Sequence, residues 1–156
     1  MTKKINWREA VRGMLMEAFS VIHGFSGGKN QAGKTETGER QIRAEEKIFQ
    51  SVRKFILQTN LPVRVEAEDH RPLDLSPEPK FIVRMDLLDG TCGYVRSQRI
   101  IGEPMTAVIT VAPILQNRNL KFDDVIAGGV IDLRNGERWI AVKEDGSYAG
   151  AINGRD

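Results

Sequence analysis

The sequence predicts an α+β fold in which two N-terminal helices pack on a mainly antiparallel sheet. Apolar residues recur with a helical period before Pro62, and they alternate or form short runs after it. An Asn135-Gly136 pair between two β-prone runs adds a hairpin signal, because Asn-Gly favours the tight turns that join antiparallel strands. We therefore expect residues 1–156 to form one domain, with its helices first and its strands afterwards.

Helical spacing defines the first two elements. Apolar side chains three or four residues apart predict a helix over residues 7–22, and the same spacing returns over residues 42–56 and stops before Asn60. Residues 23–40, between the two helices, contain five glycines among lysines and threonines. This composition predicts a long irregular loop, and long loops in compact domains are usually functional or disordered.

The second half of the chain is predicted to consist of strands. Strict alternation over residues 63–67 predicts a half-buried strand that ends at Glu68, and a Pro-rich loop then leads to a short apolar strand over residues 81–85. Further β-prone runs are separated by turn residues, and they cover residues 106–111, 125–131, 138–143 and 148–152. Consecutive strands without intervening helices favour a mainly antiparallel sheet.

Composition argues against several classes of function. The 156 residues include 23 basic and 21 acidic ones, and a formal charge of +2 spread along the chain gives no basic patch for nucleic acid. No run of about 18 apolar residues is present to span a membrane. The lone Cys92 cannot form an internal disulfide, which favours a reducing, cytoplasmic location. His23 and His70 have no cysteine partners, so a zinc site is not expected.

A phosphate-binding motif is matched by residues 28–35. The segment from Gly28 to Thr35 fits the P-loop pattern at every fixed position, including Lys34. In a P-loop, backbone amides and the lysine hold phosphates while the threonine hydroxyl reaches Mg²⁺. Such a loop follows a buried strand directly, whereas the residues before Gly28 have helical spacing. A flexible loop that fits the pattern by chance is therefore favoured, and a nucleotide-binding P-loop stays an alternative.

Acidic residues follow two of the predicted strands. The string Asp-Leu-Leu-Asp-Gly-Thr, residues 86–91, comes directly after the apolar strand, and Glu68 ends another strand. If those strands are neighbours, their ends would bring Glu68, Asp86 and Asp89 together. Carboxylate oxygens of this kind are ligands that Mg²⁺ prefers. A surface turn with a capping aspartate would give the same string, so both readings stay open on these residues alone.

These segments, taken in order, resemble the inositol monophosphatase family, the lithium-sensitive, magnesium-dependent phosphatases of inositol and sugar phosphates. The family's Glu-Glu pair and Asp-Pro-x-Asp-Gly-Thr turn are similar to Glu68-Asp69 and to residues 86–91. Residues 107–112, 127–132 and 150–154 resemble later family segments in the same order. The resemblance implies that the glycine-rich loop is a mobile loop near the metals, with Lys29 and Lys34 in it.

The chain also departs from the family pattern. Leu87 stands in place of the family's proline, and Val83 stands where a tryptophan is usual. An aspartate expected near the start of the second helix has no clear match, with Glu39 or Gln41 the nearest. The resemblance covers the family's first domain alone. The second α/β domain, which supplies another metal-binding carboxylate and most substrate contacts, has no counterpart in these residues.

The resemblance implies a role for each residue of the motif. Asp86 would bridge two Mg²⁺ ions, with Glu68 and the Leu88 carbonyl on one ion and Asp89 on the other. A metal-bound water would attack the phosphorus.

The residues that follow the metal ligands would handle the water and the phosphate. Thr91, paired with Glu68 or Asp69, would orient the attacking water. The backbone amides of Gly90 and Thr91 would hold phosphate oxygens.

The resemblance therefore implies a Mg²⁺-dependent phosphomonoesterase of inositol or sugar phosphates. Because one carboxylate is missing, we expect weak Mg²⁺ binding and low or no turnover. A non-catalytic binding or oligomerisation module is the first alternative. Apolar surface left exposed would then favour a homo-oligomer. The P-loop nucleotide-binding protein is the second alternative.

Overall fold

The structure is a computed structural model that describes residues 4–24, 31–34, 40–68, 70–89, 105–116 and 118–151. Its elements, in chain order, are α1 (Trp7–Gly24), β1 (Gln31–Lys34), β2 (Arg40–Ile42), α2 (Arg43–Thr59), β3 (Val63–Ala67), β4 (Leu73–Asp74), β5 (Phe81–Asp89), β6 (Thr106–Pro113), the 3₁₀ turn η1 (Phe122–Asp124), β7 (Ala127–Asp132), β8 (Arg138–Val142) and β9 (Gly146–Gly150). Within these ranges, no helix has the length and hydrophobicity needed to cross a membrane.

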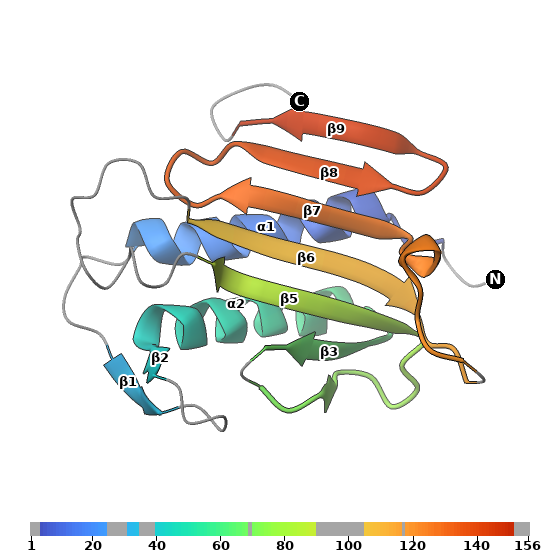
Figure 1. Cartoon of the computed structure of the whole chain (residues 1–156), viewed down its shortest axis with the longest axis horizontal. Coiled ribbons are helices and arrows are strands. Elements are labelled where there is room, and N and C mark those ends of the chain that lie inside the picture. Colours follow the sequence, from blue (N-terminus) through green and yellow to red (C-terminus); the bar gives the residue numbers. More distant parts are fainter. Residues whose placement is uncertain are drawn as a thin grey trace.

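Two layers make up the fold, as Figure 1 shows. One layer is a seven-stranded sheet with the order β4-β3-β5-β6-β7-β8-β9. The other layer consists of α1 and α2, which pack against each other and lie behind the sheet in this view. Every neighbouring pair of strands is antiparallel except β3 and β5, which are parallel. The predicted α+β fold with a mainly antiparallel sheet is confirmed.

The core lies between the helices and the sheet. Helical spacing places the fully buried residues of each helix on one stripe, and strand alternation places those of the sheet on one face. The largest of these buried side chains are Met14, Leu15, Ile48, Ile56, Ile109, Ile131 and Leu133. Trp7 closes one end of this core, because its ring meets the ring of Phe81 edge-on at a centroid distance of 4.8 Å.

Helix α1 approaches the sheet closely at Gly129 of β7. A Cβ atom built there would lie 2.9 Å from the Leu15 Cδ1 and Val11 Cγ1 atoms, and 3.0 Å from the carbonyl oxygen of Trp139. Leu15 and Val11 are both fully buried, so neither can withdraw into solvent. The glycine is therefore required by the contact between helix and strand.

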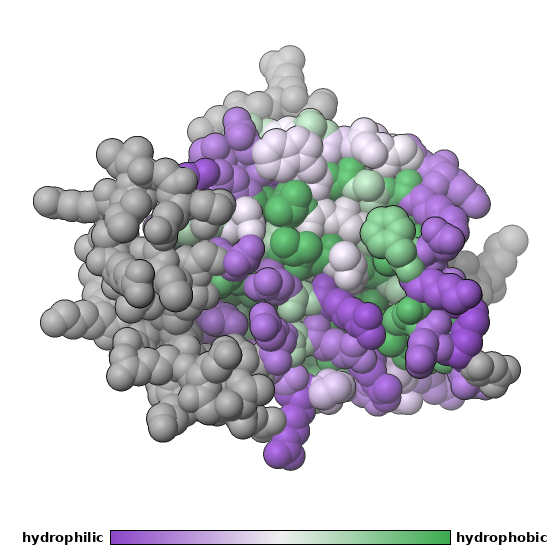
Figure 2. Space-filling model, in the orientation of Figure 1, coloured by the Kyte–Doolittle hydropathy of each residue, from purple (hydrophilic) through white to green (hydrophobic). Residues whose placement is uncertain are grey.

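The opposite face of the sheet carries no helix in Figure 1. Paired residues on neighbouring strands share a face, and the register links Asp86, Val108, Val130, Trp139 and Ala149 in one row across β5 to β9. Val130 follows Gly129, which faces α1, so this row points away from the helices. We call this side the open face. Figure 2 shows it as an apolar centre bordered by hydrophilic residues.

The structure corrects several boundaries from the sequence. The expected irregular loop over residues 23–40 contains β1, which pairs with β2 as an antiparallel hairpin. The Pro-rich loop contains β4, which pairs with β3. The apolar strand over residues 81–85 continues to Asp89, so Asp86 to Asp89 lie in a strand rather than a turn.

Two hairpin turns near the C-terminal strands contain residues with positive φ. Gly136 adopts a positive φ of 77°, and its amide donates to the Asp132 carbonyl at 2.8 Å. In the next turn, Glu144 and Gly146 have φ values of 67° and 104°. Because that turn closes at Gly146, β9 covers Gly146–Gly150 rather than residues 148–152. Likewise β6 extends to Pro113, β7 begins at Ala127, and β8 ends at Val142.

We expect Gly129→Ala to destabilise the fold by about 1–3 kcal/mol, because the added methyl group overpacks the contact with α1. Alanine would otherwise be preferred to glycine inside a strand. The matched control is Gly128→Ala on the open face, where the nearest atom to the new Cβ is the Ile109 carbonyl oxygen at 3.3 Å. Urea unfolding measures both changes. Equal stability of the two variants would contradict the close approach.

Candidate functional site

The candidate site lies at the end of the sheet where β3 and β5 finish. These strands are parallel, and Ala67 is paired with Met85. The next residue on each strand brings Glu68 level with Asp86, because parallel strands advance together. Both residues are exposed, and both line the same two hollows in the surface. The structure therefore brings together two of the residues that the sequence singled out.

A β-bulge sets the direction of the third carboxylate. Asp86 pairs with Val108, whereas Asp89 pairs with Thr106, so β5 advances three residues while β6 advances two. In a regular strand, Asp86 and Asp89 would point to opposite faces. The extra residue is accommodated at Leu87 and Leu88, which are both 3% exposed. As a result Asp89 returns to the open face that Asp86 occupies.

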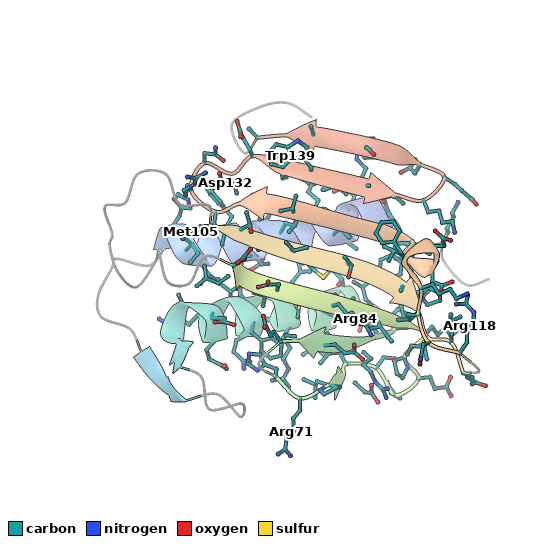
Figure 3. The ribbon with its side chains drawn as sticks, viewed as in Figure 1. Arg71, Arg84, Met105, Arg118, Asp132 and Trp139 are labelled. Carbon is teal, nitrogen blue, oxygen red and sulfur yellow. The ribbon has the colours of Figure 1, made fainter. Side chains whose placement is uncertain are left out.

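The larger hollow, of about 400 Å³, runs along the open face from the strand ends. Its polar lining comes from Glu66, Glu68, Arg84, Asp86 and Thr110. The guanidinium of Arg84 donates from Nε to the Glu66 carboxylate at 2.8 Å. Figure 3 shows Arg84 on the same side of β5 as the viewer, away from the helices.

The smaller cavity, of about 10 Å³, has room for one water molecule. Glu45 lines it from the first turn of α2, together with Glu68, His70, Asp86 and Leu87. Glu45 was not identified from the sequence, in which Glu39 or Gln41 is the nearest match to the aspartate that the family has near the start of the second helix. The signal that could have found it is the pair of acidic residues in the first turn of that helix.

His70 is held against α2 at the edge of this cavity. Its ring stacks on Phe49 with centroids 3.8 Å apart and planes within 5°. Its Nε2 atom lies 3.8 Å from a carboxylate oxygen of Glu46, and its side chain is largely buried. His70 therefore belongs to the candidate site and is not an isolated surface residue.

The residues fit Mg²⁺ by donor type. Glu68, Asp86 and Asp89 offer hard oxygen ligands at one edge of the sheet. Across the part of the chain that the structure describes, no group of three or more His, Cys, Asp or Glu side chains converges tightly enough to hold a metal. The carboxylates therefore lie at one end of the sheet but do not form a complete set of metal ligands.

Other residues of the predicted site lie outside the described residues: Asp69, Gly90, Thr91, Lys29 and Cys92. Leu88 is described and belongs to the bulge. No role for these residues is tested by the structure.

The P-loop alternative is wrong. Residues Gln31–Lys34 form strand β1, in which Gly33 pairs with Gln41 and Lys34 pairs with Arg40. A P-loop requires its Gly-Lys-Thr residues to cradle phosphates at the start of a helix. A strand paired in a hairpin does not have the loop conformation that wraps a phosphate at the start of a helix.

Asp132 lies at the end of β7, in the same row of the open face as Asp89 and Thr106. Arg134 binds it through both carboxylate oxygens, with Nη2 at 2.6 Å and Nε at 3.0 Å. These bonds, and a bond from the Arg134 backbone amide, lower the pKa of Asp132 below its ordinary value. Figure 3 shows Asp132 at this edge of the sheet. Its negative charge is already satisfied by Arg134, so it forms part of the turn rather than of the candidate ligands.

Comparison with known proteins gives a match of structure without a match of sequence. No family model matches the chain, and no curated protein matches it. The solved structure of the extragenic suppressor protein suhB from Bartonella henselae gives a TM-score of 0.69 at 14% identity, covering 97% of this chain and 53% of that one.

Two further solved structures match at similar levels. Inositol monophosphatase-II from Staphylococcus aureus gives a TM-score of 0.63 at 19% identity, over 92% of this chain and 48% of that chain. CysQ from Bacteroides thetaiotaomicron is described as a bacterial member of the inositol monophosphatase family. It gives a TM-score of 0.59 at 15% identity, over 95% of this chain and 50% of that chain.

These identities are low, so the likeness shows the fold alone. The chain spans about half the length of the solved structures that it matches. Its two helices and seven-stranded sheet have the inositol monophosphatase-like fold that the ordered motifs led us to expect.

We expect Arg134→Gln to raise the pKa of Asp132 toward its ordinary value, because the main source of the lowered pKa is removed. Ionised Asp132 stabilises the fold above its unfolded-state pKa, and this contribution is lost as the pH falls through the lowered folded-state pKa. The variant should therefore be less stable at neutral pH, by at most about 1 kcal/mol, and the difference should vanish in acid.

Carbon-13 NMR titration of the Asp132 carboxyl group measures the shift, and urea unfolding at several pH values measures its effect. Arg12→Gln, which removes the exposed pair with Glu9, is the control and should leave Asp132 unchanged. An Asp132 titration identical in wild type and Arg134→Gln would refute the assignment.

Proposed function

We propose that the carboxyl ends of β3 and β5 form a cation and phosphate site, and that the chain is a Mg²⁺-dependent phosphomonoesterase domain. Its substrate would be a phosphorylated small molecule of the inositol or sugar phosphate type. The observation that carries the proposal is the parallel register that sets Glu68 level with Asp86. The fold shared with solved inositol monophosphatases supports the same site.

Glu68, Asp86, Asp89 and the Leu88 carbonyl would hold the cation in this proposal. When bound, Mg²⁺ at such a site supplies neutralising charge for a phosphate and a water of lowered pKa. The chain itself supplies position: the bulge at Leu87 and Leu88 turns Asp89 to the face of Asp86. Phosphoryl transfer relies mainly on such positioning and on charge stabilisation.

Residues that follow β5 would handle the phosphate. The amides of Gly90 and Thr91 would donate to phosphate oxygens, and Thr91 with Glu68 or Asp69 would orient the attacking water. Lys29, and Lys34 of β1, would help to place the substrate or a metal-bound water. These assignments come from the resemblance of the sequence motifs to the inositol monophosphatase family.

Weak cation binding is expected from the surroundings of the carboxylates. Glu68, Asp86 and Asp89 are all exposed, so water screens their attraction for an ion. The described acidic side chains also do not converge on one point, so closing the site would require them to reorganise. Low or no turnover by this chain follows from the same reasoning.

We expect Mg²⁺ to bind with a dissociation constant on the order of millimolar, as at weak exposed oxygen sites, and Asp86→Asn to abolish detectable binding. Titration with Mn²⁺ followed by NMR line broadening maps the ion to the ends of β3 and β5. The control is Asp123→Asn, which changes an exposed aspartate in η1.

Cation binding that survives in Asp86→Asn would overturn the proposed site. A phosphomonoester assay with Mg²⁺ tests turnover separately. Strong activity that disappears in Asp89→Asn would show that the site is not impaired.

The open face favours a second candidate function, a binding or self-associating module. A groove of about 530 Å³ crosses β6 to β9 between Val108, Val130 and Trp139. Trp139 in this groove is 50% exposed, and Phe122, which lines a separate hollow beside β5 and β6, is 91% exposed. Contiguous apolar surface of this kind marks interaction sites in soluble proteins.

We expect the protein to self-associate at high concentration and Trp139→Glu to weaken the association, because it places a charge in the apolar groove. Light scattering coupled to size-exclusion chromatography measures the mass of both proteins. Leu57→Glu, at a position 46% exposed on α2, is the control. A monomer for the wild type at every concentration would contradict this candidate.

A further inference from the structure

Arg84 is the basic residue among the described residues that line the hollow of the proposed site. It precedes Asp86 by two residues on β5, so the two side chains share the open face with Cα atoms about 7 Å apart. The Arg84 side chain is 57% exposed. A ligand group held near Asp86 would therefore lie within reach of the guanidinium.

The guanidinium is held at one edge and available at the other. Its Nε donates to Glu66, the residue paired with Arg84 on the neighbouring strand, at 2.8 Å. Within the described residues, no acceptor is bonded to its two Nη groups. Arginine has five donors in a planar fork that matches two oxygens of a phosphate. The bond to Glu66 thus fixes the orientation of the fork without using all its donors.

The charge in this hollow makes anion binding depend on a cation. Among the described residues that line it, Glu66, Glu68 and Asp86 are acidic and Arg84 is basic, so their formal charges sum to −2. A phosphate alone would meet net repulsion. A divalent cation at Glu68 and Asp86 would offset the formal charge, after which Arg84 attracts the anion. Cation and phosphate should then strengthen each other's binding equally, as linkage requires.

We propose that Arg84 is the anion-binding residue of this site and that it receives the phosphate group of a phosphomonoester through its Nη groups. The inference rests on the proposed function, and it adds a side chain from within β5 to the backbone donors expected after that strand. Glu66 is a positioning residue in this arrangement, because it acts through Arg84. Bonds between a guanidinium and a phosphate are among the stronger hydrogen bonds in proteins.

Inorganic phosphate, titrated with and without Mg²⁺ by calorimetry, tests the inference. In the presence of Mg²⁺, Arg84→Gln should weaken phosphate binding roughly 10- to 100-fold, as expected for loss of hydrogen bonds to a charged group. The matched control is Arg64→Gln, which breaks a similar cross-strand pair with Asp74 on the same face but outside the hollow. Arg64→Gln should bind phosphate as the wild type does.

The Glu66→Gln variant tests whether Arg84 binds phosphate or only forms a structural ion pair with Glu66. It removes a negative charge from the hollow and keeps a side-chain oxygen that can accept the bond from Arg84 Nε, so the fork stays oriented and phosphate binding should be equal to or tighter than that of the wild type. Weakening in Glu66→Gln equal to that in Arg84→Gln would assign the pair a structural role and overturn the inference.

The remaining outcomes distinguish this inference from the proposed function. Mg²⁺ binding with the same phosphate affinity in Arg84→Gln and wild type would overturn the role of Arg84 and leave the cation site standing. Phosphate binding of the wild type that is independent of Mg²⁺ would overturn the charge argument. Absence of both Mg²⁺ and phosphate binding in the wild type would overturn the proposed function and this inference with it.

Discussion

The parallel pairing of β3 with β5 is the constraint on which the candidate site depends. All other neighbouring strands of the described sheet run antiparallel, so their successive ends alternate between its two edges. Parallel strands instead finish at the same edge, which places Glu68 beside Asp86. The crossover that makes this possible is the segment containing β4, which returns the chain to the start of β5. An antiparallel pairing here would separate the two carboxylates by the length of a strand.

Much of the fold could be predicted because most of its helices and strands have a clear hydrophobic period. The two helices and the strands from β5 to β9 were found, and the Asn135-Gly136 turn was placed correctly. The hairpin of β1 and β2 was missed because Gly33 and its polar neighbours have no alternating apolar pattern. Strand β4 was missed because prolines surround it and because its two residues are too few to show a period.

The acidic residues of the candidate site could be predicted from the sequence, whereas the residues that surround them could not. Strand ends predicted that Glu68 and Asp86 would be neighbours, because both residues directly follow apolar runs. Glu45, His70 and Arg84 could not be assigned in this way, since each reaches the site through tertiary packing or sheet register rather than through a local motif. Long-range pairing of this kind leaves no signature in a single segment of sequence.

The bulge in β5 also changes how the spacing of an acidic motif is understood. Side chains on a strand obey a parity rule, so two positions separated by an odd number of residues diverge. Asp86 and Asp89 break that parity and still share a face, because Leu87 and Leu88 are both turned inward. The odd spacing of the two aspartates in the sequence is therefore a consequence of the bulge. Deleting one of the two leucines would place the two aspartates an even number of residues apart and remove the need for the bulge. Inserting one residue elsewhere in the strand would reverse the direction of every side chain after it, so that the exposed side chains would point into the core.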